Sequence, residues 1–169
     1  MTDKHPAITH WRDIESDKPR SYDGDTEPMD QSARFGEHFG LQRIGINHVR
    51  LQPGRRSSYP HAESAEEEFV YVLEGTPDVW LDGHLHRLQP GDGVGFPAGT
   101  GLAHSFLNNS DAEVCLLVVG DKWHNANRIF YAVNPEQKAR REDWWHDVPA
   151  RPMGPHDGLT DAWRAAKKP

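Results

Sequence analysis

The sequence predicts an all-β protein, built as a β-sandwich or jelly-roll barrel. Short apolar and β-branched runs recur about every 8–12 residues between positions 41 and 120, and turn-forming residues separate them. No long helical pattern interrupts this stretch. The chain has 169 residues, of which 36% are hydrophobic, so it is long enough to bury one packed core.

The strands are expected to be short, and each has a recognisable end. Gln52-Pro53-Gly54 stops the first of them. Asp82-Gly83 lies between two alternating runs, which is the sequence typical of a hairpin with a type I′ turn. The expected strands, in order, are residues 41–51, 69–73, 78–81, 84–88, 91–96, 102–107 and 114–119.

Two further zones flank the barrel at residues 41–120. Residues 1–40 form a polar, turn-rich N-terminal arm, and residues 121–169 form a C-terminal extension that is largely irregular, with a weak helical pattern at residues 135–141. We expect both zones to cover edges and faces of the barrel, and an arm exchanged between two chains would do so in a homodimer. The tryptophans of the extension are expected to anchor it by packing; they are Trp123, Trp144, Trp145 and Trp163.

Composition excludes several classes of protein. The net charge is −7 and basic residues are not clustered, so neither nucleic acid nor an anionic membrane is an expected partner. The sequence has neither an apolar N-terminal segment typical of a signal peptide nor an apolar run of about 20 residues, so a soluble, cytoplasmic protein is expected. Cys115, the single cysteine, lies in an apolar run and is expected to be a small buried side chain rather than a nucleophile.

Four side chains between positions 61 and 104 suggest metal chemistry. His61 and Glu63 are two residues apart, so they project to the same face of a strand. Glu68 begins the next strand, and His104 lies on a later one. Imidazoles and carboxylates from three strands of a small barrel could converge inside it, and divalent transition metals use that ligand set.

His48 is a further candidate, on the long first strand. It follows Ile44 and Ile46 at period two, so these three residues share a face. The pattern does not decide whether that face lines the inside of the barrel, where His48 would be a pocket residue, or its outside.

The same residues resemble the two motifs of the cupin family. Gly54-x6-His61-x-Glu63-x4-Glu68-x6-Gly75 is similar to the first motif, and Gly91-x5-Pro97-x-Gly99-x4-His104-x3-Asn108 is similar to the second. The resemblance implies a double-stranded β-helix (the cupin jelly-roll barrel), and many cupins are homodimers. Two positions depart from the motifs: Glu63 replaces the second histidine, and four residues rather than two separate Gly99 from His104.

The resemblance also implies a cofactor and a range of functions. One divalent ion (zinc, iron, manganese or nickel) would be held by His61, Glu68 and His104, with Glu63 as a fourth ligand or a nearby base. The small-molecule ligand would be an oxygen-rich metabolite, such as a sugar acid or a hydroxy- or keto-acid. Glu63 or His48 would then move a proton in isomerase, lyase or hydrolase chemistry. Open alternatives are an Fe(II)-dependent dioxygenase, a non-catalytic sensor barrel and a cupin that has lost its metal.

Overall fold

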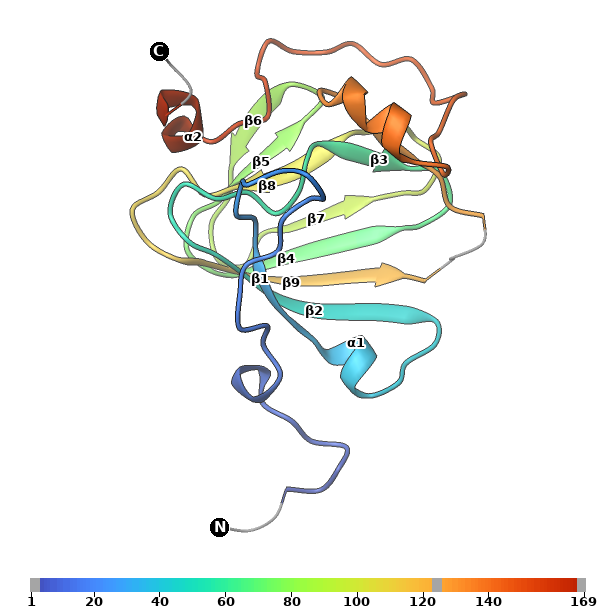
Figure 1. The fold of residues 1–169 in the computed structure, drawn as a ribbon. Coiled ribbons are helices and arrows are strands. Elements are labelled where there is room, and N and C mark those ends of the chain that lie inside the picture. Colours follow the sequence, from blue (N-terminus) through green and yellow to red (C-terminus); the bar gives the residue numbers. More distant parts are fainter. Residues whose placement is uncertain (1–3, 123–125, 167–169) are drawn as a thin grey trace.

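Two antiparallel sheets form the body of the protein (Figure 1). The computed structural model describes residues 4–122 and 126–166, and these contain ten strands in two sheets of five. The first sheet has the order β1 (Gln31–Arg34), β2 (Ile44–Leu51), β9 (Val114–Asp121), β4 (Glu68–Glu74), β7 (Gly93–Phe96). The second has the order β10 (Ile129–Tyr131), β3 (His61–Glu63), β8 (His104–Leu107), β5 (Asp78–Leu81), β6 (His84–Arg87). The expected all-β jelly-roll fold is confirmed.

Helices are short and lie outside the sheets. The described residues include two 3-10 helices, η1 (Trp11–Asp13) and η2 (Pro135–Arg140), and two α-helices, α1 (Phe35–His38) and α2 (Asp161–Ala166). The element η2 occupies the weak helical pattern expected in the C-terminal extension. Within residues 4–122 and 126–166, none of the helices is long and apolar enough to cross a membrane.

The hairpin between β5 and β6 has the expected turn. Asp82 has a φ of 44° and Gly83 a φ of 87°, and a type I′ turn requires positive φ at both central residues. Gly83 is needed for a second reason, because a Cβ atom there would lie 2.3 Å from the carbonyl oxygen of Gly154 in the C-terminal extension. The turn therefore also serves as a contact surface for the chain end.

The main core lies between the two sheets. Alternate residues of β2 and β4 point into it, among them Leu51, Val70 and Val72, each at most 1% exposed. Phe106 of β8 meets them from the opposite sheet. Full burial of each such side chain contributes roughly 1.5–3 kcal/mol, which makes this layer the main source of stability. Cys115 is 6% exposed, as expected for a small buried side chain, and burial raises the pKa of its thiol to about 11.

The N-terminal arm packs on the barrel of its own chain (Figure 1, blue). The segment from Arg20 to Met29 is closed by a backbone hydrogen bond, in which the Met29 amide donates to the Arg20 carbonyl at 2.8 Å. Tyr22 stacks on Tyr59 of the barrel with ring centroids 3.9 Å apart. The arm then continues into edge strand β1, so the first sheet extends beyond the central zone.

A buried ion pair joins the arm, the barrel and the C-terminal extension. The Glu27 carboxylate accepts two bonds from the Arg56 guanidinium, at 2.8 and 2.7 Å, and these side chains are only 3% and 2% exposed. Arg56 also donates to the Gly158 carbonyl at 2.8 Å. Three segments that are distant in sequence are thus tied to a single buried guanidinium.

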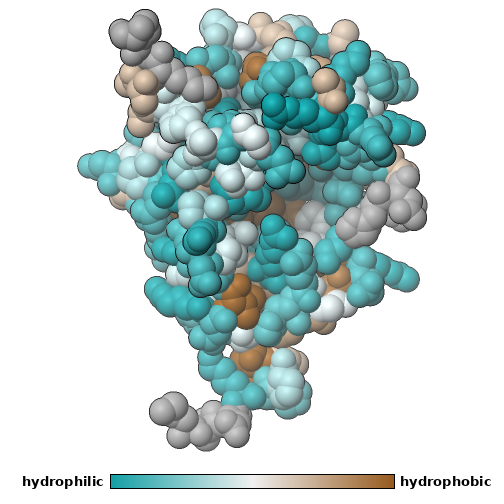
Figure 2. All heavy atoms as spheres, in the orientation of Figure 1, coloured by the Kyte–Doolittle hydropathy of each residue, from teal (hydrophilic) through white to brown (hydrophobic). Residues whose placement is uncertain are grey.

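Tryptophans anchor the C-terminal extension, as the sequence predicted. Trp144 and Trp145 are 7% and 6% exposed and join two separate apolar clusters. Trp163 is half-buried on α2, and Trp123 lies outside the described residues. The surface that remains is largely hydrophilic, and Figure 2 shows hydrophobic surface in a recess near the middle of one face.

Candidate functional site

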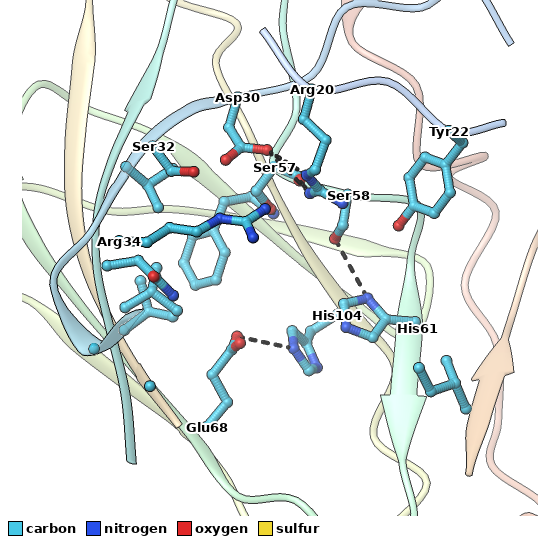
Figure 3. A pocket seen from close by; sticks show the side chains of 18 of the residues that line it. Arg20, Tyr22, Asp30, Ser32, Arg34, Ser57, Ser58, His61, Glu68 and His104 are labelled. Carbon is cyan, nitrogen blue, oxygen red and sulfur yellow. Dashed lines mark hydrogen bonds and ion pairs between the residues drawn. The ribbon is translucent and has the colours of Figure 1, made fainter. Parts of the chain in front are cut away.

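The three residues expected to hold a metal come together in one cavity (Figure 3). His61 of β3 and His104 of β8 are cross-strand partners, with ring centroids 4.9 Å apart. Glu68 extends from β4 in the opposite sheet, and its Oε1 lies 3.3 Å from His104 Nε2. The cavity has a volume of about 490 Å³, which is within the usual range for small-molecule sites.

Both imidazoles are oriented by backbone carbonyls. His61 Nδ1 lies 2.9 Å from the Tyr59 carbonyl oxygen, and His104 Nδ1 lies 3.3 Å from that of Leu102. A proton on each Nδ1 would be donated to these carbonyls, and Nε2 is then left as an acceptor toward the cavity. Metal-binding histidines are typically held in this way, because the Nδ1 bond fixes the tautomer and the ring orientation.

Electrostatics favour a neutral imidazole beside an ionised carboxylate. Burial, reinforced by the neighbouring His104, lowers the pKa of His61 to about 4. Burial alone would raise the pKa of Glu68, but its hydrogen bond and charge interaction with His104 reverse this, and the pKa falls below its usual value. At neutral pH the cavity therefore presents a lone pair of His61 and the negative charge of Glu68.

The donor set fits a divalent cation. The hydrogen bond between His104 Nε2 and Glu68 Oε1 needs a proton between the two atoms, and a divalent ion bound by both would take the place of that proton. Two imidazoles and one carboxylate are a ligand set that zinc and Fe(II) accept. The side chains are not yet in ligand geometry, however: in residues 4–122 and 126–166, no three His, Cys, Asp or Glu side chains are grouped closely enough to hold an ion.

Glu63 does not line the cavity that His61, Glu68 and His104 share. It lies beside a small hollow of about 10 Å³ that is also bordered by His104 and Phe96. Burial, followed by the charges of Glu66 and Glu68, raises the pKa of Glu63 to about 8. Glu63 is two residues from His61 on β3, and its role as ligand or base stays a prediction.

The raised pKa of Glu63 predicts a pH dependence of stability in the metal-free protein. Between its ordinary pKa of 4.5 and about 8, the unfolded chain loses this proton while the folded chain keeps it. The free energy of unfolding should therefore fall as pH rises through this interval, by at most about 1.4 kcal/mol per pH unit. Glu63→Gln should remove this component, as measured by urea unfolding in the presence of EDTA. The exposed substitution Glu37→Gln is the control, and an unchanged pH profile in Glu63→Gln would contradict the prediction.

The position of His48 contradicts its predicted place in the pocket, because His48 lies on the outer face of the first sheet. Its neighbours on β2, Asn47 and Val49, line the cavity, and a strand alternates its side chains between faces. His48 instead stacks on Trp11 of the N-terminal arm, with ring centroids 4.4 Å apart. The predicted catalytic role of His48 is thus incompatible with its position.

Known proteins are similar to this chain in sequence and in fold. A family model for the cupin domain matches residues 47–120. Polyketide synthase CurC of Streptomyces cyaneus is 31% identical over 113 residues, which make up 67% of this chain and 68% of CurC. Protein SchB of Streptomyces halstedii is 30% identical over 117 residues, 69% of this chain and 78% of SchB. The chain belongs to the cupin family.

Solved cupin structures agree with this assignment. A sugar phosphate isomerase of the cupin superfamily from Silicibacter pomeroyi is 36% identical, with a TM-score of 0.58, and the match covers 63% of this chain and 73% of that protein. The polyketide cyclase RemF of Streptomyces resistomycificus also has a TM-score of 0.58, and the match covers 81% of this chain and 94% of RemF. The two sequences are 21% identical. At that identity, the likeness to RemF concerns the fold alone.

Residues of the N-terminal arm complete the cavity of this cupin, and the sequence motifs did not point to them. Arg20 and Tyr22 precede β1, whereas Ser32 and Arg34 lie on it two residues apart. The alternation of Ser32 and Arg34 was the available signal, but a four-residue polar strand is too short for periodicity to identify. The apolar part of the wall comes mainly from the central strands, through Val49, Val70, Phe106 and Val118, and Ile129 of β10 adds to it.

Proposed function

We propose that this cupin is a divalent-metal-dependent enzyme that removes a proton from a carbon atom next to a carbonyl group. The observation that carries the proposal is the convergence of His61, Glu68 and His104 on one cavity, with two imidazoles oriented by their Nδ1 contacts. The substrate would be a small oxygen-rich molecule, which the cavity of about 490 Å³ can enclose.

His61, Glu68 and His104 would hold the ion. A bound divalent ion would act as a Lewis acid toward a substrate oxygen and lower the cost of the developing negative charge. The part that this chain supplies is a partly apolar wall, which limits water, and oriented donors that fix where the oxygen atom sits.

The names of the relatives support a carbonyl substrate. One relative is named a sugar phosphate isomerase and another a polyketide synthase. Sugars and polyketides both carry carbonyl groups, and isomerisation of a sugar between aldose and ketose begins with proton removal beside a carbonyl group. That first step, rather than a complete reaction, is what we transfer to this chain.

Glu63 is our candidate for the base that accepts the proton. It is two residues from His61 on β3 and borders a hollow that His104 also borders, and burial raises its pKa to about 8, close to neutral pH, where a general base is most effective. Glu63→Gln should keep the fold while losing the proton acceptor.

Proton exchange in heavy water tests the proposal directly. The metal-loaded protein would be incubated with a panel of β-keto acids and sugar phosphates, and loss of the proton next to the carbonyl would be followed by NMR. We expect exchange with wild type and a decrease of about 10²–10⁴-fold in Glu63→Gln, the usual contribution of a positioned base. The control is Glu136→Gln on η2. Ligand binding without exchange would favour the sensor alternative, and consumption of O₂ with Fe(II) would favour the dioxygenase alternative.

We also propose that the protein is a homodimer. Phe69, Tyr71 and Leu73 alternate along β4 on the outer face of the first sheet and are 45%, 38% and 38% exposed. A second copy covering this row would remove apolar surface from water. Light scattering should give about twice the chain mass of 19.2 kDa, and Phe69→Glu should shift the protein toward the monomer. A monomeric wild-type mass at micromolar concentration would contradict the proposal.

A further inference from the structure

Basic side chains gather around the opening of the cavity, although the chain as a whole has a net charge of −7. Arg20 and Arg34 come from the N-terminal arm and β1, and Lys122 and Arg141 line the cavity from other segments. The acidic residues that line it are Asp30, Glu37 and Glu68. Glu68 lies beside His104, so it is engaged in the candidate metal site.

A second hollow continues this basic lining toward solvent. Its volume is about 570 Å³, and it shares Arg20, Ser32, Arg34 and Glu37 with the main cavity. Lys18 and His38 add to its wall. The two hollows therefore meet at Arg20 and Arg34, and a molecule that reaches His61 from this side would pass both guanidinium groups.

The two arginines are held differently. Arg20 Nε donates to Asp30 Oδ1 at 3.0 Å, and Arg20 Nη2 donates to the Ser57 carbonyl oxygen, so its position is fixed. Arg34 Nη1 pairs with Glu37 at 3.0 Å, but these side chains are 52% and 61% exposed. An exposed pair of this kind contributes little free energy, so Arg34 can exchange Glu37 for another anion at small cost.

The surroundings supply further polar groups for an anion. Ser32, Ser57 and Ser58 also line the cavity, and Figure 3 shows Arg34 directed into the space between this group and Glu68. A guanidinium binds planar carboxylates and phosphates through paired hydrogen bonds, which a lysine cannot reproduce. Arginines with nearby hydroxyl groups are thus suited to carboxylate or phosphate oxygens.

We propose that Arg20 and Arg34 form an anion-binding subsite that holds a carboxylate or phosphate group of the substrate at the opening of the cavity. The inference deepens the proposed function, and it rests on that function for the assignment of the other end of the substrate to His61, Glu68 and His104. The substrate is then an anion with a carbonyl group at its far end. Since the arm supplies Arg20 and β1 supplies Arg34, these segments determine which anions enter.

Isothermal titration with inorganic phosphate and with malonate tests the subsite on the full-length, metal-free protein. Arg34→Gln should weaken binding of at least one probe by roughly tenfold, as expected for loss of a charge-assisted hydrogen bond. Glu37→Gln should tighten binding of the same probe, because it removes the anion that competes for Arg34. Higher salt should weaken it. The probe that responds identifies the group as phosphate or carboxylate.

An exposed ion pair elsewhere provides matched controls. Lys4 and Asp13 lie 3.3 Å apart and are 57% and 58% exposed, much like Arg34 and Glu37. Lys4→Gln and Asp13→Asn change the net charge by the same amounts and should leave binding unchanged. Equal effects of Lys4→Gln and Arg34→Gln would show that net charge alone explains the change in binding, and this would overturn the subsite. Unchanged binding in Arg34→Gln would overturn it too, and so would a wild-type protein that binds neither probe.

Metal binding by the same proteins separates this inference from the proposed function. Arg34→Gln should take up a divalent ion as wild type does. Anion binding that depends on Arg34, in a wild-type protein that takes up no metal, would support the subsite and contradict the proposed function. Metal uptake with no response to Arg34→Gln would support the proposed metal site and overturn the subsite.

Discussion

Replacing His104 with alanine is expected to abolish divalent-metal binding. The substitution removes one of three donors, and its Nε2 is the one in contact with Glu68. Even residues that merely orient a metal ligand contribute roughly 10–100-fold to affinity, so loss of a ligand should exceed about 100-fold. His61→Ala should also abolish metal binding, because it leaves only one of the two imidazoles in the cavity.

Titration with zinc, iron, manganese and nickel, together with elemental analysis of the untagged protein, measures this effect. Wild type should bind one ion per chain. His84→Ala is the matched control: His84 lies on strand β6, whose residues are all exposed, so this substitution should leave the affinity unchanged. His104 also stacks on Phe96, with centroids 3.5 Å apart, so thermal unfolding must show that the variant still folds. A folded His104→Ala protein with wild-type affinity would contradict the assignment.

Removing the carboxylate of Glu27 is expected to produce the largest loss of stability among single charge changes. Glu27→Ala leaves the Arg56 guanidinium buried without its anion, at 2% exposure. An uncompensated buried charge of this kind costs about 3–5 kcal/mol. The free energy of unfolding from urea titration measures the loss.

Two further variants separate the buried pair from charge in general. Glu37→Ala breaks an exposed pair with Arg34 and should cost at most about 1 kcal/mol. The double variant Glu27→Leu with Arg56→Met removes both charges and should recover much of the loss, since apolar groups of similar volume can replace a buried pair. Equal losses for Glu27→Ala and Glu37→Ala would show that the buried pair has no special role.

Local features of the sequence predicted much of the fold. The turn at Asp82-Gly83 could be identified because its residues tolerate the positive φ values that the turn requires. The cavity-facing positions of His61, Glu68 and His104 followed from motifs with fixed spacing. The turn depends on neighbouring residues, so one sequence was enough to identify it, whereas the convergence of the three site residues was implied by the resemblance to the cupin motifs.

Features that depend on distant contacts were missed or misjudged. Period two showed that His48 shares a face with Ile44 and Ile46, but it could not show that Trp11 would cover that face. Arg20 and Arg34 reach the cavity because the arm folds back over the barrel. Packing of this kind is determined by contacts such as Glu27 with Arg56, 29 residues apart, which leave no periodic signal.

The strand order of the first sheet has a consequence for how the chain folds during synthesis. Strand β9 (Val114–Asp121) pairs with β2 on one side and with β4 on the other, so it joins two strands made much earlier. Until the ribosome has released β9, the edges of β2 and β4 that pair with it in the finished sheet remain unpaired. Sheets assembled from such distant segments form slowly, and their open edges attract other chains. The nascent chain is therefore most prone to aggregation just before its ninth strand emerges.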